Sequence, residues 1–473
     1  MGAVTISARR LAGATPAIAL AAVCAAICAA PADAPAAAAS WSRPASAPCP
    51  ATGPPLVLFP SDKPSEPTGP GALLWPGAAA CPGGAGARVQ AIAEGATPSA
   101  PARPRSTSGA VIAPTGRIAA ASSPHGQIAI SGADPRDPSG ELLVQGRSDG
   151  RFRALVKGGP LTPPGVLATA YLGDLALLAP LSGGGGAMAV RIERWFANGL
   201  GDQLPAAPRA AGTIAAATIA MDFRSDAIAA WARRGSVWVA DLPAHGRPRP
   251  PRRLGPAGSL TRIVALLSDD NRGMVMWSAS TGATTSVWLD YSQTGPRFGA
   301  PQLLERYSDP GSGPPPAGSP SLIRLSSESV MSAWAGVEGG RWVVRTAPID
   351  QHGLRTVSTL AAPSGDALLE ALAPGPDGDA VALFGEPIGA LPAIEDLSGA
   401  PAPDPAGDQI LLAARGSEAA GRTLFAAPEA VATIPAASVA TLAIEPGTDR
   451  AVAAWEGPGG VVEYSVRTPG NGG

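Results

Sequence analysis

Side chains able to bind a metal or transfer a proton are few and scattered in this sequence. Its three histidines, His125, His245 and His352, stand far apart in segments that we expect to be turns or loops. Zinc sites need several nitrogen or sulfur ligands that converge, often from closely spaced positions. Isolated loop histidines do not meet that need. We therefore expect no metal site and no cofactor.

Two acidic clusters resemble fragments of a calcium loop, namely Asp377-Gly378-Asp379 and Asp269-Asp270-Asn271. Neither has the full series of oxygen ligands that a calcium loop supplies. Both fall where a turn between strands is expected, and turn chemistry explains Asp, Asn and Gly at such positions. The glycine run Gly183–Gly186 has no helix after it, so it does not form a phosphate-binding loop.

Cysteine placement predicts one disulfide. Of the four cysteines, Cys24 and Cys28 lie in an apolar N-terminal segment that we expect to be removed, which leaves Cys49 and Cys81. A single pair in an exported protein is expected to be oxidised. Closing a loop of this length stabilises a fold by ~3–4 kcal/mol.

The N-terminus reads as an export signal. Arg9 and Arg10 precede an apolar, alanine-rich stretch over 11–30, and small residues follow. This order is typical of a cleaved signal peptide, with cleavage between Ala30 and Ser40, so residues 1–39 form a signal peptide and an Ala/Pro-rich leader. The mature chain would then be secreted or extracytoplasmic without a membrane span. A retained N-terminal membrane anchor is the alternative, because about 20 apolar residues can cross a bilayer.

Composition excludes some partners and favours strands. The net charge of the 473-residue chain is −2, so no overall positive field attracts nucleic acid, and we expect no nucleic-acid partner. The 59 glycines and 53 prolines punctuate short apolar runs at regular intervals, as turns between strands do.

One unit recurs along the chain: an apolar run that ends in an aromatic residue, a tight turn and a second alternating run. The stretch 226–241, DAIAAWARRGSVWVAD, shows it most clearly. The residues at which the apolar runs end are spaced about every 50 positions, which is typical of propeller blades. These anchors are Trp75, Ser131, Ala179, Trp231, Trp277, Trp334, Phe384 and Trp455.

Most units contain four short apolar segments, which is the strand content of a blade. We therefore predict an all-β fold, a β-propeller of four-stranded blades over 56–468. Eight blades are expected, or seven if the first unit is only an added hairpin. Residues 40–55 should be irregular and 469–473 a disordered tail. The last unit lacks an outer strand, which the N-terminal region would supply to close the ring.

Six anchors are aromatic, and this invites a carbohydrate-stacking interpretation. Residues at equivalent positions of every blade are more often packed between blades, because aromatic burial joins neighbouring sheets. We therefore predict a blade core that consists of Trp75, Trp231, Trp277, Trp334, Phe384 and Trp455.

The repeat, with its G-x-A-φ-A-W run, turn, second run and closing G-x-F-x-x-P, resembles the degenerate repeats of exported bacterial β-propellers, including sialidase-like and TolB-like propellers. The resemblance covers roughly 56–467 and includes no catalytic motif. Sialidase-like propellers carry S-x-D-x-G-x-T-W boxes, which Ser148-Asp149-Gly150 only approaches. They also need an arginine cluster and a Tyr/Glu pair, and Tyr171, Tyr291, Tyr307 and Tyr464 stand in no recognisable motif.

Long loops point to where a ligand would bind. The stretches 133–139, 309–320 and 386–408 are expected on one face of the propeller, and loops clustered on a rigid scaffold usually carry binding. The sequence thus predicts no catalytic residues and a binding scaffold for an unknown protein or glycan on that face. A glycan-cleaving, sialidase-like hydrolase is the alternative.

Overall fold

The computed structural model describes residues 40–63, 66–67, 70–92, 99–123, 126–157, 165–170, 174–183, 187–196, 199–200, 204–205, 214–244, 248–292, 297–308, 318–326, 329–363, 365–388, 407–419 and 421–468. They belong to one compact unit over 40–469. This part of the chain is almost entirely strand, and its helical element is one short 3-10 turn, η1 (Pro458–Gly460). Nowhere in it is there a helix of the length and apolarity needed to cross a membrane.

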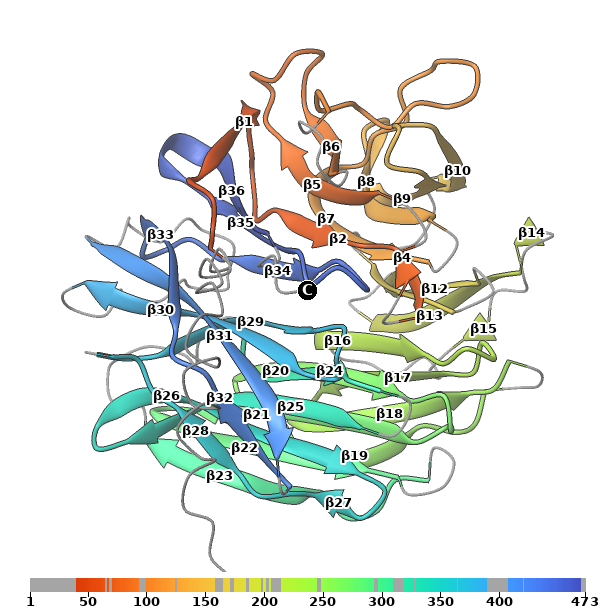
Figure 1. Cartoon of the computed structure of the whole chain (residues 1–473). Helices are drawn as coiled ribbons and strands as arrows, with labels where there is room; N and C mark the ends of the chain where they lie inside the picture. The colour runs from red at the N-terminus through yellow and green to blue at the C-terminus, as the bar shows by residue number, and fades with distance from the viewer. Residues whose placement is uncertain are drawn as a thin grey trace, which may run out of the picture. The chain divides into compact units, whose positions relative to one another are not determined.

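Among the described residues, seven sheets of four or five strands form the blades of a β-propeller. Each blade starts at its innermost strand and is built outwards by antiparallel pairing. Successive inner strands contact one another around the centre, and the chain colour follows the blades in order (Figure 1). Side chains of these inner strands are often partly exposed, as expected where they line a central channel.

The first three blades are made of the following strands. Blade 1 has β7 (Thr115–Ser122), β8 (Ile128–Asp134), β9 (Asp137–Gly146) and β10 (Phe152–Lys157). Blade 2 has β11 (Val166–Thr169), β12 (Leu175–Gly183), β13 (Ala187–Phe196), β14 (Gly199–Leu200) and β15 (Leu204–Pro205). Blade 3 has β16 (Ile214–Met221), β17 (Ala227–Arg233), β18 (Ser236–Leu242) and β19 (Arg252–Pro256).

Four more blades complete the set. Blade 4 has β20 (Leu260–Leu267), β21 (Gly273–Thr281), β22 (Thr284–Tyr291) and β23 (Gln302–Ser308). Blade 5 has β24 (Ser321–Arg324), β25 (Val330–Glu338), β26 (Arg341–Asp350), β27 (Gly353–Leu354) and β28 (Ser358–Leu360). Blade 6 has β29 (Leu368–Pro374), β30 (Ala380–Ile388), β31 (Asp408–Ala419), β32 (Arg422–Phe425) and β33 (Glu429–Pro435). Blade 7 has β34 (Thr441–Ile444), β35 (Ala451–Glu456), β36 (Val461–Arg467) and β1 (Ala45–Pro50).

A three-stranded sheet lies between blades 7 and 1. It consists of β2 (Leu56–Leu58), β5 (Gly71–Gly77) and β6 (Gly86–Ile92), and a short hairpin of β3 (Ser61–Lys63) and β4 (Glu66–Pro67) is inserted in it. Where a fourth strand would pair, the described chain makes the isolated bridge between Val89 and Ala102. The expected count of eight four-stranded blades is thus one too many, because the first unit is an incomplete sheet.

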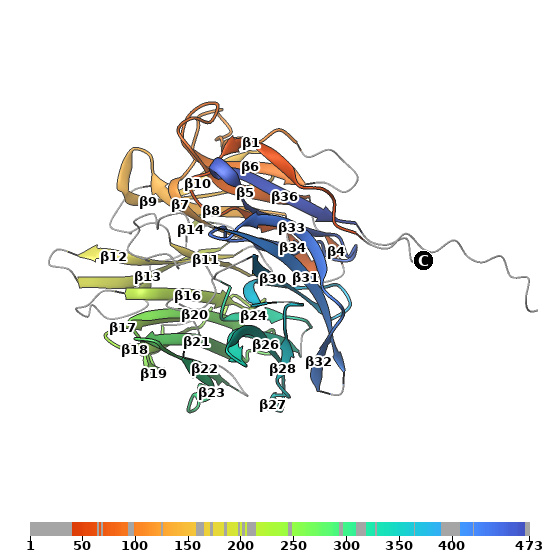
Figure 2. The same ribbon diagram turned by 90° about the vertical axis from the view of Figure 1, so that its left-hand side faces the viewer.

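The N-terminal strand closes the ring, as the sequence predicts. β1 pairs antiparallel with β36, so the first and last described strands share blade 7 (Figures 1 and 2). The segment 40–55, expected to be irregular, therefore contains a strand, which satisfies the outer edge of the last blade.

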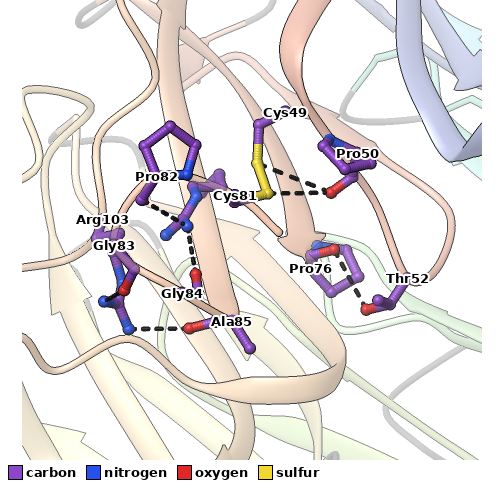
Figure 3. Close-up of a disulfide and its surroundings, with 11 residues drawn as sticks. Cys49, Pro50, Thr52, Pro76, Cys81, Pro82, Gly83, Gly84, Ala85 and Arg103 are labelled. Carbon is purple, nitrogen blue, oxygen red and sulfur yellow. Dashed lines mark hydrogen bonds between the residues drawn. A yellow bond between two sulfur atoms is a disulfide. The ribbon is translucent and has the colours of Figure 1, made fainter. Parts of the chain in front are cut away.

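The predicted disulfide fixes this closure. Cys49 at the end of β1 is bonded to Cys81 in the loop between β5 and β6, with a Cα–Cα distance of 5.2 Å (Figure 3). The Ala85 carbonyl of this loop accepts from the guanidinium of Arg103, which follows β6, at 2.8 Å. The disulfide therefore ties blade 7 covalently to the three-stranded sheet.

Aromatic anchors fill the interfaces between sheets. Each packs against the sheet that precedes its own in the ring, and all are at most 1% exposed. They are Trp75, Trp231, Trp277, Trp334, Phe384 and Trp455.

Ser131 does not belong to this series. Its neighbours Ile128 and Ile130 pack toward the preceding sheet, whereas Ser131 bonds to Gly165 in the following blade. Since strand side chains alternate between faces, alignment of Ser131 with the tryptophans was wrong by one residue. Its hydroxyl and the buried Glu141 carboxylate instead accept from the Gly165 N–H, at 3.0 Å for Ser131 Oγ and 3.2 Å for Glu141 Oε2.

Candidate functional site

Three charged residues lie near the start of inner strands. Arg117, Arg262 and Glu370 are each the third residue of β7, β20 and β29, in blades 1, 4 and 6. All inner strands run in the same direction, because every blade begins with one. The three residues therefore lie toward the end of the channel at which the chain enters each blade, which we call the channel mouth.

A β-bulge sets the position of Glu370. In the pairing of β29 with β30, Leu369 opposes Phe384 and Ala371 opposes Leu383, so Glu370 is the extra residue between them. A bulge of this kind re-aims a side chain relative to the regular pleat, and bulges are over-represented next to functional sites. Glu370 is partly exposed although its neighbour Leu369 is fully buried, and its carboxylate contacts Ala440 in the segment that enters blade 7.

The Glu370 carboxylate is held by hydrogen bonds and sits close to a cation. Its Oε2 accepts from the Ala440 N–H at 3.2 Å, and the Gln409 side chain also donates to it. Burial raises the pKa of Glu370 to about 7, although these two hydrogen bonds and the positive charge of Arg262 oppose the rise. This charge interaction therefore links two inner strands, β20 and β29, that are two blades apart.

Gln409 is itself tightly placed. It is fully buried, its Nε2 donates to the Ser438 carbonyl at 3.3 Å, and its Oε1 lies against Gly385, where a Cβ would stand 1.8 Å away. The absence of a side chain at Gly385 therefore leaves the space that the Gln409 amide occupies. Glu370 and Gln409 together join blade 6 to the segment that enters blade 7.

The groups around Glu370 can exchange hydrogen bonds with a ligand. A carboxyl group that is partly protonated near neutral pH can accept or donate a hydrogen bond. The guanidinium of Arg262 is a positively charged hydrogen-bond donor. Glycoside hydrolysis canonically needs a second carboxylate, and the sialidase variant needs a tyrosine nucleophile. The described tyrosines lie elsewhere: Tyr291 is on β22, Tyr307 on β23 and Tyr464 on β36, none of which is an inner strand.

The other predicted site residues serve turns and ion pairs, where they are described. His352 is exposed in a turn, and its N–H donates to Asp350 Oδ1 at 2.7 Å; His125, His245 and Tyr171 lie outside the described residues. No group of three or more metal-ligating side chains converges within the described ranges. Asp149 accepts from the Arg151 N–H at 3.0 Å, which is ordinary turn geometry.

Both acidic clusters pair with arginines. Asp377 and Asp379 flank Gly378, which has a φ of 73°, and both bind Arg415, which also contacts Asp449 at 2.5 Å. In the other cluster, Asp269 lies 2.7 Å from Arg324. These contacts join neighbouring blades at the end of the channel opposite the mouth.

The structure differs from the sequence prediction most clearly at the expected binding loops. The stretch 133–139 is not a long loop, since β8 and β9 are joined by Pro135-Arg136 alone and Asp134 pairs with Asp137. Asp134 Oδ1 accepts from the Arg136 N–H at 2.9 Å, a local bond that tightens the turn. Of the other two loops, 309–317 and 389–406 lie outside the described residues.

Sequence reasoning missed Glu370 and Arg262. A signal was present, because each is a charged residue inside an otherwise apolar run, LLEALAP and LTRIVALL. Charged residues are seldom enclosed unless they are paired, so these two positions stood out from the pattern of the strand.

Comparisons with known proteins do not assign this chain to a family. No protein-family model matches the chain. No curated protein matches its sequence. The chain is similar to several solved structures at low identity. One is the WD40 domain of SCAP from fission yeast, at 10% identity over 91% of this chain and 98% of that chain, with a TM-score of 0.43.

Two enzymes are among the similar structures. An ulvan lyase, from a new family of polysaccharide lyase, is 9% identical over 89% of this chain and 95% of that chain, with a TM-score of 0.43. The Trypanosoma rangeli sialidase in complex with the inhibitor DANA is 12% identical over 68% of this chain and 56% of that chain, with a TM-score of 0.34.

Proposed function

We propose that this protein is an exported, non-catalytic β-propeller that binds a glycan or a protein at the channel mouth, outside the cytoplasm. The observation that carries the proposal is the placement of Glu370, the bulged residue near the start of an inner strand, whose carboxylate accepts from the Ala440 N–H, interacts with the charge of Arg262 and has a pKa raised by burial to about 7. Such a group offers a ligand both an acceptor and a donor inside a rigid ring.

Export is supported by two features. The sequence begins with a segment of signal-peptide character, and the fold contains a disulfide between Cys49 and Cys81. Disulfides persist in oxidising compartments. Thiol labelling of the chain recovered from the producing cell tests this directly, because an exported chain has no free thiol at these two positions.

A glycan array tests the binding proposal. The mature chain is expected to bind a definable set of glycans, and Glu370→Ala and Arg262→Ala are expected to weaken that binding at least tenfold. Asp377→Asn is the matched control, because Asp377 is an exposed carboxylate at the opposite end of the channel. Binding that survives both channel substitutions would refute the assignment to the channel mouth.

The glycan-cleaving alternative gives a different result in the same assay. A hydrolase would release free sugar from the array glycans, and Glu370→Gln would stop the release. Support for binding comes from the described partners of Glu370, which are the Arg262 charge, the Gln409 amide and the Ala440 N–H, with no described tyrosine among them.

A further inference from the structure

A second candidate site lies on the outer side of the propeller, between blades 5 and 6. A groove of about 390 Å³ is lined by residues 356–361, which include β28, and by residues 422–426, which include β32. These two strands lie side by side (Figures 1 and 2). Each is an outer strand of its blade, so the groove is separate from the inner strand that carries Glu370.

Both strands leave one edge unpaired. Among the described strands, β28 pairs only with β26, and β32 pairs only with β31. The Thr356 N–H donates to the Gly421 carbonyl at 3.1 Å, and this contact joins the two segments at one end of the groove. An unpaired edge presents backbone donors and acceptors with which another strand can pair.

The edges at this groove lack the protection found on other blades. Charged residues and prolines oppose unwanted strand pairing at an edge. The outer strands of blades 1, 3, 4 and 7 each contain two or more of them, in the sequences FRALVK, RRLGP, QLLERYS and ASAPCP. By contrast, β28 reads STL and β32 reads RTLF, so Arg422 is the one charged residue in these two strands and neither contains a proline.

Apolar side chains are also exposed at this groove. Of the five large hydrophobic residues that are exposed on the described chain, two line it, namely Val357 at 45% and Leu424 at 46%. The strand that carries Leu424 is fixed from below, because Thr423 is 2% exposed and its hydroxyl donates to Met331 Sδ at 3.2 Å. Exposed apolar residues gathered on a fixed edge are typical of a surface that another chain covers.

We propose that this groove binds an extended segment of a partner protein, which pairs with the unpaired edge as an added strand. Backbone hydrogen bonds give such a segment its affinity, and its alternate side chains give specificity. Its apolar side chains contact Val357 and Leu424. Arg422 is exposed and is the one charged residue in the described lining, so it selects a segment that carries an acidic residue.

Charge decides against a second copy of this chain as the occupant. A symmetric dimer through this groove brings the Arg422 of each copy to one interface. Like charges on paired strands are destabilising, whereas an acidic residue of a partner segment offsets the charge of Arg422.

Selection from a random-peptide phage library on the mature chain tests this proposal. We expect the enriched peptides to have apolar residues at alternate positions and at least one acidic residue. The most enriched peptide, made with a fluorescent label, should bind the chain in a fluorescence-anisotropy titration. A version with N-methylated backbone amides should bind about tenfold more weakly or worse, because a methylated amide cannot donate to a strand edge.

Variants of exposed residues make the result specific without loss of the fold. Val357→Lys and Leu424→Lys place a charge at the edge, so each should weaken peptide binding about tenfold and leave Tm unchanged. Leu303→Lys is the matched control and should leave binding unchanged, because Leu303 is 40% exposed on β23, the outer strand of blade 4. Arg422→Glu should weaken binding of the acidic peptide, and a peptide with lysine in place of its acidic residue should restore it.

Several results would overturn the proposal. They are the absence of any enriched peptide, binding that persists in both lysine variants of the groove, and equal binding of the N-methylated peptide. Light scattering that shows a dimer, converted to a monomer by Leu424→Lys, would assign the groove to a second copy instead. Since Glu370 is not part of this groove, failure here leaves the channel-mouth proposal standing.

Discussion

The Trp334 indole Nε1 donates a hydrogen bond to Glu305 Oε2 at 2.7 Å, and the two residues belong to different blades. Trp334 is on β25 of blade 5, and Glu305 is on β23 at the outer edge of blade 4. Arg345 also approaches this carboxylate, at 3.7 Å. The anchor aromatic therefore joins two blades by a directed polar contact as well as by apolar packing.

Trp334→Phe should test the polar part of this contact. The phenyl ring keeps most of the packing but leaves Glu305 without its indole donor, so we expect a loss of about 1–3 kcal/mol in the free energy of unfolding. Trp231→Phe is the matched control, because no described group accepts from the Trp231 Nε1. Denaturant titration of both variants measures the difference. Equal losses would show that the hydrogen bond contributes nothing.

Trp277→Ala should test the apolar part. Trp277 is fully buried, stacks on Trp288 at a centroid distance of 6.2 Å, and donates to the Pro256 carbonyl at 3.0 Å. Removal of the ring leaves a cavity between blades 3 and 4, which we expect to cost ~3–5 kcal/mol. Thermal or denaturant unfolding reports the loss, and an unchanged Tm would contradict the packing role.

Loss of the Cys49–Cys81 disulfide should weaken the closure of the ring. The double variant Cys49→Ala/Cys81→Ala is expected to lose ~3–4 kcal/mol, because the unfolded chain is no longer constrained by the cross-link. Addition of a reductant to the natural chain should give a similar loss and should not affect the double variant. A natural chain whose unfolding is insensitive to the reductant would contradict this expectation.

The sequence alone predicts the repeat, the propeller and the disulfide because each depends on a local pattern. Every tryptophan anchor ends an apolar run before a turn, so burial, strand length and turn position all point to one unit. The closing strand β1 was also predictable, since the last unit lacked an outer strand.

What sequence could not predict depends on register and on bulges. Ser131 was placed with the tryptophans because a one-residue slip is invisible in a run such as QIAIS, yet it moves the side chain to the other face. Glu370 is the extra residue of a bulge in β29, and the apolar run LLEALAP does not show where that bulge falls. Pro135-Arg136 is a tight turn because Asp134 closes it, which composition alone does not show.

Two enclosed carboxyl groups should make the protein more stable in mildly acidic than in mildly alkaline solution. Burial raises the pKa of Glu370 from 4.5 to about 7 and that of Asp222 from 3.8 to about 6, where the nearby Asp226 also contributes to the rise. Between the unfolded and folded pKa values, the native state binds more protons than the unfolded chain. The free energy of unfolding is therefore highest at low pH within this window and falls as pH rises through about 6 to 7.

Glu370→Gln should remove most of that slope. The amide keeps an oxygen that accepts from the Ala440 N–H but cannot ionise, so the variant should match the natural chain near pH 5 and exceed it by about 2–3 kcal/mol near pH 8. Glu463→Gln is a useful control, because that carboxylate accepts from the Trp455 indole at 2.9 Å on the outer side of blade 7. Urea unfolding of each chain across this pH range measures the slope. A Glu370→Gln curve parallel to that of the natural chain would mean that Glu370 titrates normally, and the channel mouth would then hold an ordinary ionised carboxylate.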